Sequence, residues 1–172
     1  MTSAKSAEVA ASIPGPTGSR SETGGSGSTW RVEYSVEAAT TPEIVWGLWT
    51  DVGSWNAWSS SLHTSRLDGA FVAGGRGELH LKEGPTVGIE LLVVEPTRGF
   101  TDETRLPRGR ILTVHEVERQ SSGVRITHGI AVEGPMAGRL GIQVAKDLLT
   151  STQAFVELAE QQHRTQQRGA CG

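Results

Sequence analysis

Two histidines and one aspartate are the residues of this 172-residue chain whose spacing could support proton transfer. His115 and His128 lie among aliphatic residues in the stretch ILTVHEVERQSSGVRITHGIAV, and Asp102 precedes them in GFTDETRLP. A carboxylate beside an imidazole fixes its tautomer and raises its basicity, and a second imidazole can donate or accept a proton. Brought together in an apolar cavity, the three side chains would form an acid–base site.

The sequence around the two histidines predicts a β-hairpin of strands 110–118 and 124–133. Alternate residues of a strand face opposite sides. In both strands the charged residues share the face opposite to the histidine, so His115 and His128 are expected to point inward. A two-residue turn at Ser121-Ser122 places them directly opposite each other, with their Cβ atoms about 5 Å apart. A turn one residue later separates them by two residues but leaves both on the same face.

Asp102 is predicted on the preceding strand, 99–106, with its side chain on the same inner face. A turn at Arg108-Gly109 pairs Asp102 with His115. The aspartate and the two histidines then form a row across three neighbouring strands.

Three other interpretations of these residues remain open. Each histidine taken alone is more often a hydrogen-bonded core residue than a catalytic one. Asp102 could instead lie in a loop or bulge and face water, since strand boundaries taken from one sequence err by about 2–4 residues. Two histidines and a carboxylate are also a ligand set for zinc or ferrous iron, but no HxH, HxxxH or cysteine-containing spacing supports a metal, and none is expected.

The elements that would hold these residues form one domain, predicted at 30–165. Residues 1–29 are rich in glycine, serine, threonine and proline and predict a disordered arm, and residues 166–172 predict a flexible tail. WRVEYSVEA alternates as a half-buried strand does, and TTPEIVWGLWTDV predicts a helix capped by Thr41 with Pro42 in its first turn. A second short helix is expected over GSWNAW.

Six further apolar or alternating segments predict strands separated by turns. They lie near 62–67, 76–82, 87–95, 99–106, 110–118 and 124–133. Short connections of this kind favour an antiparallel meander. A long C-terminal helix is predicted to begin just after Pro135, because apolar residues recur there at helical spacing, and Gly138 and Gly141 are expected to weaken its first turns.

Composition argues against several classes of partner and location. The formal net charge is −3 from 16 basic and 19 acidic residues, which offers no basic patch for nucleic acid. The single cysteine, Cys171, allows neither a disulfide within the chain nor a cysteine metal cluster. No apolar run approaches the roughly 20 residues of a membrane span, and the N-terminal residues do not read as a secretory signal. We therefore expect a cytoplasmic protein, for which a homodimer is one allowed assembly.

An apolar cavity for a hydrophobic small molecule is expected beside the polar row. Trp55 and Trp58, close to a predicted loop, are candidates for a lid that stacks on a flat ligand. The other residues expected to line the cavity are Ile89, Leu91, Val93, Phe100, Thr104, Thr113, Ile126, Ile130, Leu140, Val144 and Leu148.

From Trp30 to about His163 the chain resembles the START-like, or helix-grip, superfamily, specifically its polyketide cyclase/dehydrase and lipid-transport branch. The matching segments are VEYSVEAATTPEIVWGLWTDVGSWNAW, FVAGGRGELHLKEGP, VEPTRGFTDETRLP and THGIAVEGPMAGRLG. The resemblance implies an α+β helix-grip fold, in which a curved antiparallel sheet of six to seven strands wraps around a long C-terminal helix, with two short helices after the first strand. It also implies a deep apolar cavity between sheet and helix.

The resemblance also frames the functional hypotheses. Aromatase/cyclases of the superfamily often hold a poly-β-keto chain with an arginine, whereas strand parity turns Arg105 and Arg110 of this chain outward. The leading hypothesis is a small cofactor-independent cyclase or dehydratase of secondary metabolism for an apolar, carbonyl-bearing, polyketide-like substrate, with His115 as base, oriented by Asp102, and His128 as proton donor. The alternatives are a non-catalytic carrier of a lipid, quinone or polyketide, and a partner protein whose N-terminal arm docks elsewhere.

Overall fold

The first strand forms one edge of the sheet. The computed structural model describes residues 28–170, so the predicted arm lies outside the described residues except for its last two, Ser28 and Thr29. β1 (Thr29–Ala38) alternates as the sequence predicts, and it pairs along its whole length with the last strand of the chain. The first and last strands of the chain are therefore neighbours in one sheet.

Two short helices follow β1, as the sequence predicts. α1 (Pro42–Thr50) begins after Thr41, whose hydroxyl accepts a hydrogen bond from the backbone N–H of Ile44 at 3.3 Å. Pro42 suits the first turn because it has no N–H group to leave unpaired. η1 (Val52–Ala57) is a short 3₁₀ helix. Together they carry the chain from one edge of the sheet to the other.

Seven antiparallel strands form one sheet in the order β1-β7-β6-β5-β4-β3-β2. The six strands after the short helices are β2 (Leu62–Leu67), β3 (Arg76–Leu81), β4 (Thr86–Glu95), β5 (Gly99–Leu106), β6 (Gly109–Gln120) and β7 (Gly123–Glu133). Each of them pairs with the next along the chain, and β7 pairs with β1. The predicted antiparallel meander is confirmed.

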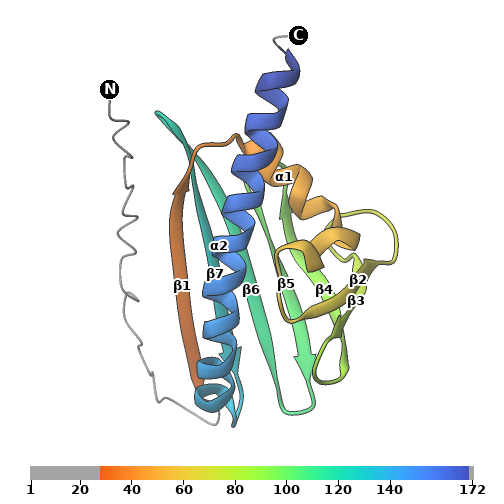
Figure 1. Cartoon of the computed structure of the whole chain (residues 1–172). Helices are drawn as coiled ribbons and strands as arrows, with labels where there is room; N and C mark the ends of the chain where they lie inside the picture. Colours follow the sequence, from red (N-terminus) through yellow and green to blue (C-terminus); the bar gives the residue numbers. More distant parts are fainter. Residues whose placement is uncertain (1–27, 171–172) are drawn as a thin grey trace.

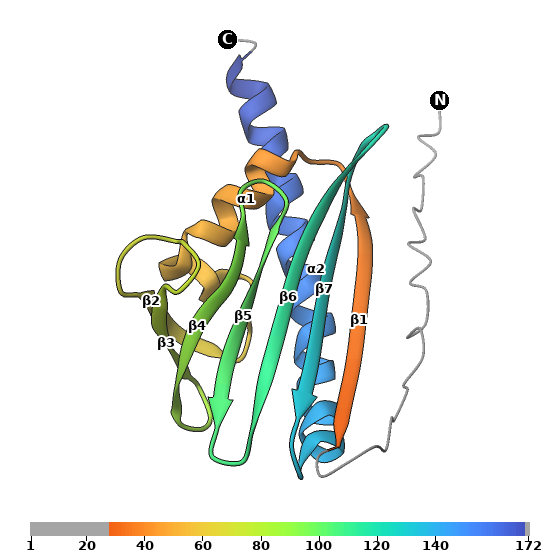
Figure 2. The ribbon, with the colours of Figure 1, turned by 180° about the vertical axis from the view of Figure 1, so that it is seen from behind.

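The long helix α2 (Ala137–Ala170) lies diagonally across the inner face of the sheet (Figure 1), where it packs mainly against β1 and β7. Seen from behind, the sheet shows the face that α2 does not cover (Figure 2). The helix continues past the boundary predicted at 165. Its last turns contain an i,i+4 ion pair between Glu160 and Arg164 at 3.7 Å, and glutamine and arginine there are good helix formers.

Aromatic rings fill the space between α1, the C-terminal half of α2 and the sheet. Trp49 and Phe155, both 0% exposed, stack with their ring centroids 5.7 Å apart. Phe100 of β5 lies edge-on to Trp49 at 5.7 Å, and Trp55 stacks on Phe100 at 6.0 Å. The main hydrophobic core is therefore concentrated at the end of the sheet that the C-terminal half of α2 covers.

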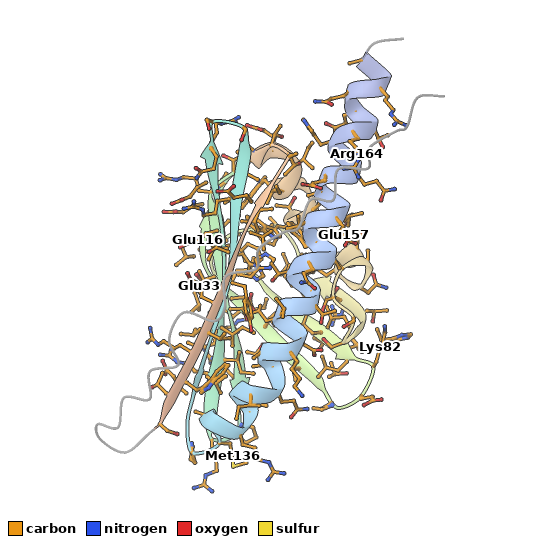
Figure 3. The ribbon with its side chains drawn as sticks, turned by 60° about the vertical axis from the view of Figure 1, so that its left-hand side comes forward. Glu33, Lys82, Glu116, Met136, Glu157 and Arg164 are labelled. Carbon is orange, nitrogen blue, oxygen red and sulfur yellow. The ribbon has the colours of Figure 1, made fainter. Side chains whose placement is uncertain are left out.

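Charged residues occupy the outer face of the sheet. Figure 3 shows Glu33 of β1 and Glu116 of β6 on the side opposite to α2. Arg105 and Arg110 contact the carboxylate of Glu103 there, at 2.7 and 3.3 Å, so both lie outward as parity predicts. Hydrogen bonding from Arg105, and then from Arg110, holds the pKa of Glu103 below its usual value.

The Glu103→Gln variant is expected to unfold at a lower urea concentration than wild type at neutral pH, because Arg105 and Arg110 each lose one of the two carboxylates that they contact. The pKa of Glu103 is lowered in the folded state. Its ionised carboxylate therefore adds to the free energy of unfolding above the ordinary pKa, and this stabilisation is lost as the pH falls through the pKa of the folded protein. Urea midpoints in about 1 M salt, where the Debye length is about 3 Å, should differ less than those at low salt. An equal difference at both salt concentrations would contradict an electrostatic origin.

Candidate active site

His115 and His128 face each other across β6 and β7. The strand register pairs them directly, because Gln120 pairs with Gly123 and the turn is at Ser121-Ser122. Their ring centroids are 4.7 Å apart, and the rings meet edge to face. Both side chains point inward and are buried, with 5% and 1% of their surface exposed. The predicted geometry of this pair is confirmed.

Asp102 lies on the inner face as predicted, but its predicted pairing with His115 is wrong by two residues. The β5–β6 turn is one residue earlier than expected, since Leu106 pairs with Gly109, and a shift of the turn by one residue moves the register by two. Phe100 is therefore opposite His115, and Asp102 is opposite the next inward residue. A two-residue shift keeps the side chain on the same face, so Asp102 Oδ2 still lies 3.4 Å from His115 Nε2.

A hydrogen-bonded hydroxyl assigns the tautomer of His128. The hydroxyl of Thr152 donates to the carbonyl oxygen of Leu148, one helical turn earlier, at 2.7 Å. Thr152 Oγ1 is therefore free to accept, and His128 Nδ1 lies 3.0 Å from it. This arrangement places the ring proton on Nδ1 and leaves the lone pair on His128 Nε2.

Burial disfavours the charged form of all three groups. It raises the pKa of Asp102 from 3.8 to about 7 and lowers the pKa of His115 from 6.5 to about 3. The pKa of His128 is lowered well below 6.5, by burial first and by His115 second. Near neutral pH both imidazoles are thus uncharged, while Asp102 is divided between its acid and its carboxylate. Desolvation therefore outweighs the increase in basicity that the sequence predicts for His115.

Aromatic side chains surround the two imidazoles. Phe100 stacks on His115 with ring centroids 4.1 Å apart and a 9° angle between the planes. The predicted lid residues are instead parts of the core: Trp55 is 4% exposed and Trp58 is 7% exposed. The indole N–H of Trp55 donates to the carbonyl oxygen of Trp49 at 2.9 Å, which holds this ring in place. The prediction of a lid is therefore wrong, because the chain after α1 folds inward.

Beside the polar group the inner face of β6 and β7 is only partly covered. We call this strip, with the N-terminal half of α2 next to it, the groove, and we define it by five partly exposed side chains: Ile111, Thr113 and Ile130 of the sheet, and Leu140 and Val144 of α2. Ile111 and Thr113 are partly exposed because α2 packs mainly on β1 and β7 and leaves the inner face of β6 less covered. Asp102 and Thr104, 4% and 8% exposed, lie on β5 beside this groove.

The remaining predicted cavity residues divide between core and surface. Ile89, Leu91, Ile126 and Leu148 are buried. Val93 is 49% exposed, so its predicted place in the cavity is wrong. The register between β4 and β5 shifts between Leu91 and Val93, and this irregularity turns Val93 to the outer face, where it pairs with Thr101.

Sequence reasoning missed two residues of the site. Ile111 belongs to the groove, and its strand parity, the same as that of His115, is the signal that could have found it. Thr152 fixes the His128 tautomer, and a signal for it exists: it lies on the apolar stripe of α2 between Leu148 and Phe155, where a hydroxyl is out of pattern. In the described part of the chain no three histidine, cysteine or acidic side chains group together as metal ligands would. Within residues 28–170 no helix is long and apolar enough to cross a membrane.

Solved structures of several proteins are similar to this chain. A protein from Mesorhizobium loti has a TM-score of 0.65 at 15% identity, over 76% of this chain and 97% of its own. The di-domain ARO/CYC StfQ from the steffimycin biosynthetic pathway also has a TM-score of 0.65, at 9% identity, and the matched 78% of this chain spans 51% of it. Truncated norcoclaurine synthase from Thalictrum flavum has a TM-score of 0.61 at 10% identity, over 80% of this chain and 97% of its own. At these identities the likeness is one of fold.

The family model provides the assignment that the fold likeness alone does not. Comparison of the sequence with curated proteins found no match. The family model described as "Polyketide cyclase / dehydrase and lipid transport" matches residues 29–160, which span all seven strands and most of α2. The chain therefore belongs to this family, within the START-like superfamily that its sequence resembles.

Proposed function

We propose that the chain binds an apolar, carbonyl-bearing molecule in the groove and catalyses its dehydration or cyclisation by proton transfer at Asp102. One observation carries this proposal: a carboxyl group with a pKa of about 7 lies beside the groove, 3.4 Å from a neutral imidazole. A general acid–base group works best when its pKa is near the working pH. Asp102 meets this condition, whereas His115, with a pKa of about 3, does not.

The proposed role of Asp102 therefore differs from the one expected from the sequence. The carboxylate of Asp102 takes a proton from the carbon next to the substrate carbonyl. In dehydration the C–O bond at the next carbon then breaks, and Asp102 returns the proton to the leaving hydroxyl, which departs as water. In cyclisation the enolate forms a carbon–carbon bond to a second carbonyl, whose oxygen receives the proton.

His115 is proposed to keep the proton transfer free of net charge. When Asp102 is protonated it donates to His115 Nε2, and when it is ionised the imidazole presents Nε2–H to the carboxylate. The ring can do both by changing tautomer, without becoming a cation that burial disfavours.

Fold neighbours are consistent with carbonyl chemistry, since norcoclaurine synthase from Thalictrum flavum has been solved with dopamine and hydroxybenzaldehyde.

Dehydration of a β-hydroxyketone tests the proposal directly. The probe is 4-hydroxynonan-2-one, whose product is a conjugated enone with strong ultraviolet absorbance. We expect the rate to rise with pH to a plateau, with its midpoint near pH 7, and to fall by about 100-fold in Asp102→Asn. Binding of the probe, measured by ligand-observed NMR, should change little because the amide has the shape of the carboxyl group.

Glu103→Gln is the matched control for this experiment. Glu103 is the next residue along β5 and lies on the opposite face of the sheet, so its substitution should leave the dehydration rate unchanged. Turnover that survives in Asp102→Asn, or that has the same pH profile in the variant, would overturn the assignment of proton transfer to Asp102.

Carriage without conversion is the second candidate function, and the neutral imidazoles favour it. Since burial holds His115 uncharged, the unpaired Nδ1–H of its ring can donate a hydrogen bond to a ligand carbonyl without transferring the proton. Native mass spectrometry of the purified protein distinguishes the two. An unchanged co-purified apolar ligand, together with binding but no turnover of the β-hydroxyketone, would favour carriage.

A further inference from the structure

Four buried polar atoms without a partner lie on one group of touching rings. In residues 28–170, the only buried side-chain nitrogen and oxygen atoms that lack a hydrogen bond are Trp49 Nε1, Trp58 Nε1, His115 Nδ1 and His128 Nε2. The four residues are between 0% and 7% exposed. The His128 ring centroid lies 4.7 Å from that of His115, 6.0 Å from Trp49 and 6.2 Å from Trp58. We call these four residues the ring cluster.

Leaving such groups unpaired is costly. A buried donor or acceptor without a partner costs about 1–3 kcal/mol, and most buried polar side-chain atoms in proteins are paired. Trp55 follows that rule, because its indole N–H donates to the carbonyl oxygen of Trp49 at 2.9 Å. The unpaired atoms are thus concentrated at one place in the core instead of being spread through it.

The donors and acceptors of the ring cluster define what would complement them. An indole N–H can only donate. His128 Nε2 can only accept, because its Nδ1 proton is committed to Thr152. An oxygen atom that accepts from an indole and also donates to an imidazole belongs to water or to a hydroxyl group, and of these only a hydroxyl group can be part of an organic ligand. A ketone or ether oxygen has no proton to give to His128 Nε2.

The ring cluster is the continuation of the groove along the same strands. His115 follows Thr113 on β6 by two residues, and His128 precedes Ile130 on β7 by two. Two residues of a strand span about 7 Å. A molecule in the groove that reaches past Asp102 would therefore bring its end to the ring cluster, among aromatic faces that favour a flat ring.

We propose that the ring cluster is a hydroxyl-binding subsite, which takes the hydroxyl of an aromatic ligand lying in the groove. The indole N–H groups of Trp49 and Trp58 donate to the hydroxyl oxygen, and the hydroxyl proton goes to His128 Nε2. This inference deepens the proposed function and rests on it for the presence of a bound ligand. It makes the two tryptophans and His128 determinants of specificity, separate from proton transfer at Asp102.

A pair of matched probes tests the subsite. The probes are 4-propylphenol and its methyl ether, 4-propylanisole, in which a methyl group replaces the hydroxyl proton. We expect the phenol to bind at least about 10-fold more tightly, because a site built to hydrogen-bond a hydroxyl rejects the analogue without one. In protein carrying ¹⁵N-labelled tryptophan, the phenol should move the Nε1–H signals of Trp49 and Trp58 downfield and leave that of Trp55 in place.

Tryptophan-to-phenylalanine variants assign the N–H groups. Trp58→Phe removes an unpaired N–H and keeps an aromatic ring, so the ratio of phenol to ether affinity should fall by at least about threefold. Trp55→Phe is the control: its N–H is already used within the core, so the ratio should stay as in wild type even if the fold is less stable. The NMR measurement needs no variant and therefore stands if either one folds poorly.

The outcomes separate this inference from the proposed function. Equal affinity for phenol and ether, unmoved signals of Trp49 and Trp58, or no binding of either probe overturns the subsite. The test of proton transfer is independent, because it depends on Asp102→Asn and on a β-hydroxyketone. Loss of dehydration in Asp102→Asn together with equal phenol and ether affinity would refute the subsite alone. Phenol preference together with unchanged dehydration in Asp102→Asn would refute the catalytic proposal alone.

Discussion

The Asp102→Asn variant is expected to gain stability over wild type as the pH rises, by about 4 kcal/mol between about pH 4 and pH 8. The reason is that the wild-type carboxyl group is buried and the asparagine amide cannot ionise. The amide can also donate to His115 Nε2, as is proposed for the protonated carboxyl group. A residue proposed to be essential for turnover is thus expected to limit stability at alkaline pH.

The sign follows from the two pKa values of Asp102. In the folded protein its pKa is about 7, above its ordinary value of 3.8. Below about pH 3.8 Asp102 is protonated in both the folded and the unfolded protein, so it adds no pH dependence to the free energy of unfolding. Between the two values the folded state keeps a proton that the unfolded state has released, so the free energy of unfolding falls as the pH rises. Above pH 7 this loss is complete.

The histidines change the wild-type profile in the opposite sense. Burial lowers the pKa of both His115 and His128. The folded protein is therefore not destabilised by them above about pH 6.5, and the free energy of unfolding falls on acidification, because the unfolded chain takes up protons that the buried rings do not. Urea unfolding of wild type and Asp102→Asn at matched pH values removes this background, because both proteins contain both histidines. The difference in unfolding free energy is the quantity to plot against pH.

Glu103→Gln again serves as the matched control. The pKa of Glu103 is lowered in the folded wild type. The Glu103→Gln variant should therefore lose stability relative to wild type as the pH rises, opposite to Asp102→Asn. The two residues are neighbours on β5 but face opposite sides of the sheet. A difference for Asp102→Asn that stays constant from about pH 4 to pH 8 would mean that the carboxyl group is not desolvated.

Gly141→Ala and Gly138→Ala are expected to change stability in opposite directions, by about 3 kcal/mol between them. Both glycines lie in the first turns of α2, where alanine favours a helix. A methyl group at Gly138 meets nothing within 4 Å, so Gly138→Ala should stabilise by up to about 1 kcal/mol. A methyl group at Gly141 would overlap the indole ring of Trp30, so Gly141→Ala should destabilise by about 2 kcal/mol.

A double-mutant cycle isolates the contact with Trp30. In a Trp30→Ala background the three atoms that a methyl group at Gly141 would approach most closely are removed, and Gly141→Ala should then stabilise the helix as Gly138→Ala does. Urea denaturation of the four proteins of the cycle measures the coupling. The same destabilisation by Gly141→Ala with and without Trp30 would show that the cost arises within the helix itself.

The sequence determined which face each residue of the site occupies. Side chains alternate along a strand with a period of two, so the charged residues of β6 and β7 placed His115 and His128 inward without any knowledge of the fold. The same rule kept Asp102 inward although its register was predicted wrongly, because turns change register in steps that preserved parity here. The start of α1 could also be predicted from the sequence, because Thr41 as a cap and Pro42 in the first turn favour the beginning of a helix whatever the helix packs against.

Tertiary structure decided the quantities on which function depends. The irregularity between Leu91 and Val93 turned a predicted cavity residue outward, and the inward fold of the chain after α1 placed Trp58 in the core. Burial by residues distant in sequence, such as Trp49 of α1, whose ring centroid lies 5.8 Å from that of His115, changed the expected ionisation of Asp102 and His115, because desolvation depends on everything packed around a group. Periodicity in the sequence predicts on which face of the sheet a side chain lies, but only the assembled core determines how much water reaches that side chain.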